Sequence, residues 1–545
     1  MIARTVRNKP IGSKGPQFIL IKLMKVIKSR GRKILILLLP VFFNISCQQI
    51  NKNHSHQSVS DKSIIKGKEL AASYCQSCHM LPDPSQLDSK SWENGVLPAM
   101  GPRLGIFYFD SKEYPSSRYD PNVGSRFYPE LPVISFDDWQ HIIDYYSSTS
   151  PDTLPALVRA QKVMDGSKYF NVKTPERGRY EPTTTLLKID TTVRPYRIWI
   201  GDMSSTQLYE YNNQLSLLDS LKMISPVVDI EVNRGQLYTC NIGVMKPNNG
   251  KSGSSGRVVP GSENKLQLDT SFHFGKLARP VQISAKDFNG DHKTDFLVCE
   301  FGNLSGSLTW MENKGNNEFE RHVLRNFPGA IKAYIRDMNG DQLPDIMALF
   351  AQGDEGIFEF INKGGGNFEQ RQLLRFPAVF GSSYFELADF NKDGFPDILY
   401  TCGDNADYSP VLKPYHGIYI FINDGKNKFN QQCFLPMYGC FKAIARDFDN
   451  DGKLDIAAIS FFADYNHNSD ETFLYFHQLE NLTFDTFKIP GTSGGRWLTM
   501  DAGDMDGDGK EDILLGNFSI ELAKMKNASS WKNGAPYIML NNTIK

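Results

Sequence analysis

Five consecutive residues, Cys75-Gln76-Ser77-Cys78-His79, carry the densest potential chemistry of the chain. Two thiols and an imidazole at this spacing suit covalent haem attachment, a redox dithiol or half of a zinc site. Chance explains the pattern poorly, because a random Cys-x-x-Cys-His is expected only about 0.002 times in a chain of this composition. A zinc site needs a second ligand pair and a thioredoxin-like dithiol needs a βαβ context, and the sequence supplies neither. The motif therefore favours haem.

In the haem interpretation, the thiols of Cys75 and Cys78 form thioethers to the porphyrin. Their spacing on one helical turn places His79 beneath the iron as the proximal ligand. Export would also suit this chemistry, because covalent haem attachment takes place outside the cytoplasm in bacteria.

Two predicted helices flank the motif. Residues 63–74, SIIKGKELAASY, predict a helix that runs into it, with Gly67 and Tyr74 on faces that can meet another helix. Residues 135–138, SFDD, form a capping box before a second helix. Its apolar positions follow the i, i+3, i+4, i+7 pattern and are Trp139, Ile142, Ile143 and Tyr146.

This arrangement resembles the class I cytochrome c domain over residues 62–155, chiefly through the CQSCH motif. The resemblance implies a small all-α domain in which the first and last helices cross while loops wrap a covalent haem c. It also implies a methionine as distal iron ligand. Met100, on a predicted Pro/Gly-rich loop after a short helix near Trp92, occupies the corresponding place, with a core methionine or a five-coordinate iron as the alternatives.

A second chemical pattern, D-x-[DN]-x-D-x-x-x-D, occurs five times. Oxygens at positions 1, 3, 5 and 9, with the carbonyl of position 7, can converge on one hard cation, and calcium fits because it takes six to eight oxygens. The predicted calcium ligands are Asp287, Asn289, Asp291, Asp295, Asp337, Asn339, Asp341, Asp345, Asp389, Asn391, Asp393, Asp397, Asp447, Asp449, Asp451, Asp455, Asp504, Asp506, Asp508 and Asp512. The alternative is a plain β-turn whose side chains cap the backbone. An EF-hand is excluded, because strands flank the pattern and position 12 has no Glu.

The five acidic loops also reveal an internal repeat. Their first aspartates recur every 50 to 58 residues, and each loop lies between strand-like runs that are followed by two further strands. Four short antiparallel strands at this period predict a propeller blade. Two blades without the acidic loop precede these five, which gives a seven-bladed β-propeller over residues 180–545. The last blade lacks its fourth strand, so an N-terminal strand such as TTLLKID is expected to complete the ring.

The repeats resemble the FG-GAP/VCBS family, which also forms the propellers of integrin α-subunits. The acidic loops match well, whereas the flanking FG and GAP signatures are mostly absent. The resemblance therefore implies the fold, with structural calcium, more than an adhesion role.

The N-terminal segment predicts export. Residues 34–43, ILILLLPVFF, follow a basic stretch and are too short to span a bilayer. The following Ser46-Cys47 resembles a bacterial lipoprotein signal, which implies acylation of Cys47 and a periplasmic or cell-surface protein held at a membrane by lipid. The alternative is an ordinary signal peptide with an incidental cysteine. Met24 begins a signal of normal size, so the start is Met1 or Met24.

The chain thus divides into a signal (1–47), a polar linker (48–61), the cytochrome-like domain (62–155), a second linker (156–179) and the propeller (180–545). The net charge of −1 gives no basis for nucleic-acid binding. Five other cysteines are expected to be mostly buried thiols, with Cys433 and Cys440 able to bridge. Long loops between second and third strands are candidate binding elements; they span 241–257, 402–417, 461–472 and 517–534, with Asp404, Tyr408, His416, Asp464, His467 and Trp531 as candidate contacts.

Three functions compete. The first is an exported electron-transfer protein whose propeller docks a redox partner protein or a small-molecule substrate. The second is a quinoprotein-dehydrogenase-like oxidoreductase with haem c as internal electron acceptor, although no quinone-binding signature, Ser-His-Asp pattern or ligating His cluster is found. The third is a binding or adhesion module. The sequence favours electron transfer over catalysis.

Overall fold

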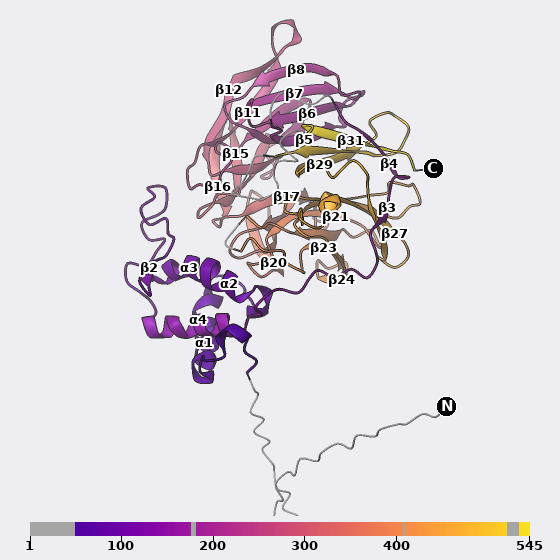
Figure 1. Cartoon of the computed structure of the whole chain (residues 1–545). Coiled ribbons are helices and arrows are strands. Elements are labelled where there is room, and N and C mark those ends of the chain that lie inside the picture. The colour runs from indigo at the N-terminus through magenta and orange to yellow at the C-terminus, as the bar shows by residue number, and fades with distance from the viewer. Residues whose placement is uncertain (1–49, 176–180, 407–408, 520–533, 545) are drawn as a thin grey trace, which may run out of the picture. The chain divides into compact units, whose positions relative to one another are not determined.

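The computed structural model describes residues 50–175, 181–406, 409–519 and 534–544. A helical part comes first and a ring of β-sheets follows it (Figure 1). The predicted signal, including Cys47, lies outside the described residues.

Two helices of the helical part cross at a glycine. Helix α1 (Asp61–Tyr74) begins at an N-cap in which the Ser60 side chain accepts a hydrogen bond from the Ser63 amide, and α4 (Phe136–Thr149) begins in the same way at Ser135. A Cβ atom added at Gly67 would lie 1.8 Å from the carbonyl oxygen of His141, so only glycine permits this close approach. The predicted helices and their crossing are therefore both present in the structure.

Short elements connect these two helices. They are η2 (Cys75–Ser77), η3 (Pro84–Gln86), α2 (Ser89–Ser91), the π-helical turn η4 (Trp92–Val96), α3 (Leu97–Met100), η5 (Gly101–Leu104) and a hairpin of β1 (Tyr108–Phe109) and β2 (Lys112–Glu113); η1 (His54–His56) precedes α1. Trp92, Trp139 and Tyr146 are buried in the shared core.

Seven sheets form the propeller, as the repeat predicts; each has four antiparallel strands, and the sheet of the sixth blade has a fifth strand. The first two blades are β5 (Thr184–Asp190), β6 (Arg197–Asp202), β7 (Gln207–Asn212), β8 (Leu217–Lys222), and β9 (Val227–Asn233), β10 (Gln236–Asn241), β11 (Gly253–Pro260), β12 (Leu266–Leu277). The next two are β13 (Pro280–Lys286), β14 (Asp295–Glu300), β15 (Ser307–Gly315), β16 (Glu318–Arg325), and β17 (Ala330–Arg336), β18 (Asp345–Phe350), β19 (Gly356–Asn362), β20 (Phe368–Arg375).

The last three blades carry the remaining acidic loops. They are β21 (Ser382–Ala388), β22 (Asp397–Cys402), β23 (Gly417–Asn423), β24 (Phe429–Pro436); β25 (Cys440–Arg446), β26 (Asp455–Ser460), β27 (Phe473–Gln478), β28 (Phe484–Lys488); and β29 (Trp497–Gly503), β30 (Asp512–Asn517), β31 (Tyr537–Asn542) with β4 (Phe170–Lys173). Short turns η6 (Ser262–Asn264) and η7 (Ser469–Thr472) lie in connections.

The strand that closes the ring differs from the prediction. TTLLKID forms β5, the innermost strand of the first blade, whereas β4 pairs antiparallel with β31 and completes the seventh blade (Figure 1). A further strand, β3 (Met164–Asp165), pairs parallel with β28 of the sixth blade. The segment expected to be a linker (156–179) therefore contributes two strands to the propeller.

How deeply a strand is buried depends on its position within the blade. Every residue of the second strands β14, β18, β22, β26 and β30 is buried, because these strands are covered by neighbouring blades on both faces. Outer strands such as β20 are mostly exposed. Each innermost strand contacts that of the next blade, and β29 contacts β5, which closes the ring.

Candidate functional sites

The Cys-x-x-Cys-His segment continues helix α1. Cys75 caps the helix, and the backbone stays right-handed helical as far as Cys78. Both thiols are free, with Cys78 exposed and Cys75 half-buried. Burial, with repulsion from Cys78, raises the pKa of the Cys75 thiol to about 11.

The imidazole of His79 is oriented by the backbone. Its Nδ1 lies 2.8 Å from the carbonyl oxygen of Met80, and a carbonyl can only accept, so Nδ1 carries the proton. The neutral ring then keeps its lone pair on Nε2, which has no hydrogen-bond partner among the described residues. This is the tautomer that a metal-ligating histidine requires.

Met100 lies at the end of α3, so its position on a loop was predicted wrongly. Pro98 and Pro102 stand near the starts of α3 and η5, where a missing N–H is tolerated, and the chain therefore stays helical. Met100 and Cys75 are both half-buried and pack against the same cluster of buried residues.

These residues fit a covalent haem c in their chemistry. Two free thiols on one helical turn, an imidazole with an available Nε2 and a nearby thioether are the groups that such a cofactor needs.

The helical part contacts the propeller beside this segment. The hydrophobic cluster that includes Cys75 also includes Val379, Phe380 and Tyr415 of the propeller. The Tyr415 hydroxyl lies 3.0 Å from the carbonyl oxygen of Gln86. These propeller residues come from connections opposite the acidic loops, so the helical part covers some of the long-loop face.

The ninth position of every acidic loop bonds to protein groups. Each of these aspartates is almost fully buried, and burial raises the pKa of all five carboxyls, that of Asp455 to about 6. Four of them accept one backbone N–H from position 2 and one from the third strand: Asp295 from Phe288 and Asn313, Asp345 from Met338 and Asn362, Asp397 from Phe390 and Asn423, and Asp512 from Met505 and Asn542. The ninth aspartate thus ties the hairpin to the third strand, a role that spacing alone did not reveal.

The first, third and fifth positions form the candidate cation site. In the sixth and seventh blades their carboxylate oxygens lie within 4.8 Å of one another; the residues are Asp447, Asp449, Asp451 and Asp504, Asp506, Asp508. One of these oxygens, Oδ1 of Asp447, is buried without a hydrogen-bond partner. Clustered carboxylates with an unpaired buried oxygen fit a hard dication such as calcium.

Loops with asparagine at the third position are arranged differently. The Asn339 amide donates to Asp341 (2.9 Å), and the Asn391 amide donates to Asp393 (2.8 Å). All five loops share left-handed residues at positions 4 and 6, such as Gly507 and Gly509 at φ 81° and 87°. The five loops therefore share one backbone conformation and differ in their number of carboxylates.

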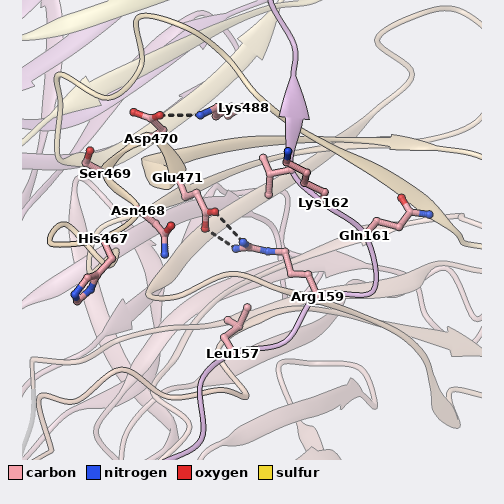
Figure 2. A pocket seen from close by; sticks show the side chains of 11 residues that line it. Leu157, Arg159, Gln161, Lys162, His467, Asn468, Ser469, Asp470, Glu471 and Lys488 are labelled. Atoms are coloured by element: carbon pink, nitrogen blue, oxygen red, sulfur yellow. Dashed lines mark hydrogen bonds and ion pairs between the residues drawn. The ribbon is translucent and has the colours of Figure 1, made fainter. Parts of the chain in front are cut away.

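A cavity of about 480 Å³ lies where the segment after the helical part runs along the sixth blade (Figure 2). Its wall includes Arg159, whose guanidinium donates two hydrogen bonds to Glu471 at 2.7 and 2.8 Å. Arg159 also donates to the Pro436 carbonyl, so the segment is fastened to the blade. A composition-based linker assignment could not find this site, because an ion pair over this separation leaves no local signal.

The predicted loop contacts are only partly accessible. His467 is exposed, whereas Asp464 is buried and His416 is completely buried, which makes the prediction wrong for the last two. Tyr408 and Trp531 lie outside the described residues. The loop predicted over 241–257 is shorter, because β11 already begins at Gly253. All five cysteines of the propeller are free, and only Cys433 is not fully buried.

Comparison with known proteins agrees with the fold. Residues 287–348, 337–400 and 447–515 match the FG-GAP-like repeat family, so the seven-bladed propeller contains FG-GAP-like repeats. Among the described residues, no helix has the length and apolar character needed to cross a membrane.

Similar curated proteins include two integrins. The chain is 33% identical to integrin alpha-PS3 of Drosophila melanogaster over 135 residues, which is 21% of this chain and 12% of that protein. It is 26% identical to integrin alpha-3 of Cricetulus griseus over 186 residues, which is 31% of this chain and 17% of that protein. It is 24% identical to the T-cell immunomodulatory protein homolog of Plasmodium falciparum over 330 residues, or 46% of this chain and 45% of that protein. The chain thus spans less than half of each relative.

Proposed function

We propose that the chain is an exported protein that binds a partner through its propeller and carries a covalent haem c in its helical part. The FG-GAP-like repeats and the integrin relatives support the binding role and the export. One observation carries the haem proposal: the Cys75–Cys78 turn continues α1 and presents His79 with its Nε2 available.

In this proposal Cys75 and Cys78 hold the porphyrin, His79 ligates the iron and Met100 is its second ligand. A haem bound in this way supplies one-electron transfer. The Met80 carbonyl keeps the proton on Nδ1 of His79 and fixes the ring. Because Cys75 packs against a hydrophobic cluster that includes Val379 of the propeller, the redox group would lie close to the propeller, and a partner docked there would be near it.

The visible spectrum of the purified full chain tests the haem proposal. Reduced protein is expected to show c-type haem bands that survive denaturation, because the attachment is covalent. Cys75→Ala/Cys78→Ala should lose the attached haem, whereas Cys433→Ala, a half-buried propeller thiol, should keep it. Wild-type protein without these bands, after expression with a haem-attachment system, would refute the proposal. A second chromophore would instead favour the quinoprotein-dehydrogenase alternative.

We further propose that divalent cations stabilise the acidic loops, above all those of the sixth and seventh blades, and that calcium is the ion where the ligands are all oxygens. A dication among three carboxylates removes their mutual repulsion and occupies the unpaired oxygen of Asp447. Thermal unfolding should shift downward in EDTA and recover with calcium but not with magnesium, which demands a smaller octahedral site. A melting curve unaffected by either treatment would contradict this.

For its location we propose a bacterial lipoprotein acylated at Cys47. A lipid at this cysteine would hold the protein at a membrane without a spanning helix. Cys47→Ser should release the protein into the soluble exported fraction, and unchanged membrane association would refute acylation there.

A further inference from the structure

The acidic loop of the sixth blade lies beside a third-strand histidine, and no other blade with an acidic loop has a histidine at this position. His477, near the end of β27, points its Nδ1 at the loop: the atom lies 3.4 Å from Oδ2 of Asp449 and 3.2 Å from Oδ1 of Asp455, with which it forms a hydrogen bond when no metal lies between them. Those carboxylates are the third and ninth positions of the loop. The three side chains are 21%, 14% and 1% exposed, so the group is largely shielded from solvent.

The seventh blade provides an internal comparison. In both blades one third-strand residue donates its backbone N–H to the ninth aspartate: Gln478 in the sixth blade and Asn542 in the seventh. His477 and Asn541 are the residues that directly precede them, so they occupy equivalent positions. The Asn541 amide donates to Asp506 and to Asp512, both at 2.9 Å, which are again the third and ninth positions. At this position the sixth blade therefore has an imidazole and the seventh blade a carboxamide.

The distances at His477 suit a small tetrahedral cation. Two ligands of a tetrahedral zinc, with bonds of about 2.0 Å, are separated by about 3.3 Å. The two measured separations lie on either side of that value. The ligand atoms of His477, Asp449 and Asp455 all lie within 4.8 Å of one another.

Neighbouring groups hold the carboxylates in this geometry. The Tyr475 hydroxyl donates to Oδ2 of Asp455 at 2.5 Å, and the Gln478 amide donates to Oδ1 at 2.8 Å. This is the outer-shell support typical of metal ligands. Asp447 and Asp451 form a separate cluster with Asp449, in which the buried Oδ1 of Asp447 has no hydrogen-bond partner.

We propose that His477 converts the acidic loop of the sixth blade into a mixed nitrogen–oxygen site that binds zinc, while the seventh-blade loop stays an oxygen-only site. Imidazole nitrogen is a preferred ligand of zinc, whereas calcium selects oxygen. The inference rests on the proposed role of these loops as cation sites and names the metal for one of them. Asp449, Asp455 and His477 are the ligands.

A second cluster offers a contrast. Glu312, Glu320 and His322 of the third blade also bring their ligand atoms within 4.8 Å. There, however, the Lys314 ammonium lies 3.0 Å from Glu312 and 3.2 Å from Glu320, so a protein cation already neutralises the carboxylates. This cluster is expected to retain no zinc.

The test counts zinc on the full chain. Free thiols are first alkylated, because Cys75 and Cys78 would themselves bind zinc where no haem is attached. The protein is stripped with a chelator, loaded with zinc in excess calcium, desalted and analysed for metals. Wild-type protein is expected to retain one zinc per chain, and His322→Gln should retain the same.

Exchange of the two blades' residues is the matched control. His477→Asn gives the sixth blade the side chain that the seventh already tolerates, and it should lose the zinc; Asn541→His should gain a second one. X-ray absorption of the wild-type zinc should show a histidine nitrogen that is absent in His477→Asn. Zinc retained at wild-type level by His477→Asn, or none on the wild type, would overturn the inference. A calorimetric titration of the full chain with calcium tests the calcium proposal for the seventh-blade loop independently.

Discussion

Removal of the ninth carboxylate of an acidic loop should destabilise the propeller even without calcium. Asp397 is the clearest case, because it is 0% exposed and each of its oxygens accepts a backbone N–H, from Phe390 at 2.9 Å and from Asn423 at 2.8 Å. Asp397→Ala leaves both donors buried and unpaired, and each such donor costs about 1–3 kcal/mol. The expected loss is therefore about 2–6 kcal/mol.

The lower half of that range is the better expectation at neutral pH. Burial raises the pKa of Asp397, so the folded state already carries a penalty for holding this charge, and the alanine variant is relieved of it. Asp397→Asn keeps one acceptor oxygen and should lose about half as much, about 1–2 kcal/mol.

Urea unfolding in EDTA, followed by tryptophan fluorescence, measures the effect. Asp393→Ala is the matched control, because Asp393 is the exposed fifth position of the same loop and its removal strands no buried donor. It should unfold within about 0.5 kcal/mol of wild type in EDTA and lose part of any stabilisation by calcium. If Asp397→Ala also unfolds within that margin in EDTA, the ninth carboxylate does not tie the hairpin to the third strand.

Three other perturbations give separable outcomes. Gly67→Ala should destabilise the helical part by about 1–3 kcal/mol in far-ultraviolet circular dichroism melts, because the new Cβ would lie 1.8 Å from the His141 carbonyl oxygen; Gly124→Ala, where a Cβ meets nothing within 4 Å, should not, and equal melts would contradict the crossing. Lys442→Met should raise the melting temperature at pH 7. Burial lowers the pKa of Lys442 to about 8 in the folded state, so the charged lysine destabilises the fold by its full amount below that pH. The gain should vanish as the pH rises from 8 towards the unfolded value of 10.5, and a gain independent of pH would contradict this. Arg159→Met should speed limited proteolysis of residues 156–163 about tenfold, since it removes the two bonds to Glu471 (Figure 2), whereas Lys162→Met should not; equal rates would show that the segment is held by other contacts.

The repeat carried most of the fold prediction. Each acidic loop has a strong local signature, and the buried second strand that follows reads as an apolar run, as in DILLGN from Asp512. Blade number and strand order follow from that signal and its period. The helix crossing was also readable, because a glycine and a capping box are local features.

The closing strand was assigned wrongly for a physical reason. Only four residues of β4, FNVK, pair with β31, and they follow a stretch with no alternation of apolar and polar residues. TTLLKID has a far stronger strand signal and was preferred, but the first blade needs it. Long-range pairing of a short strand depends on which partner is left open when the ring is otherwise complete, and local sequence does not encode that.

The site residues were likewise predictable only where they lie close together in the sequence. The residues of the acidic loops were found by spacing, because they lie within nine positions of one another. His477 was missed, since it lies 22 residues after Asp455 and still further from Asp449, and only the fold brings them together. The burial of His416 was missed for the same reason.

The pairing of β4 with β31 also sets the order in which this protein can fold. Strand β4 is synthesised before every complete blade, but its partner β31 is made after all of them. The helical part and the individual blades can fold as they emerge. The ring can close only after the chain has been made through Asn542, and β4 stays unpaired until then. The final step closes a loop of nearly the whole propeller, and because of this entropy cost we expect the β4–β31 seam to be the last contact formed.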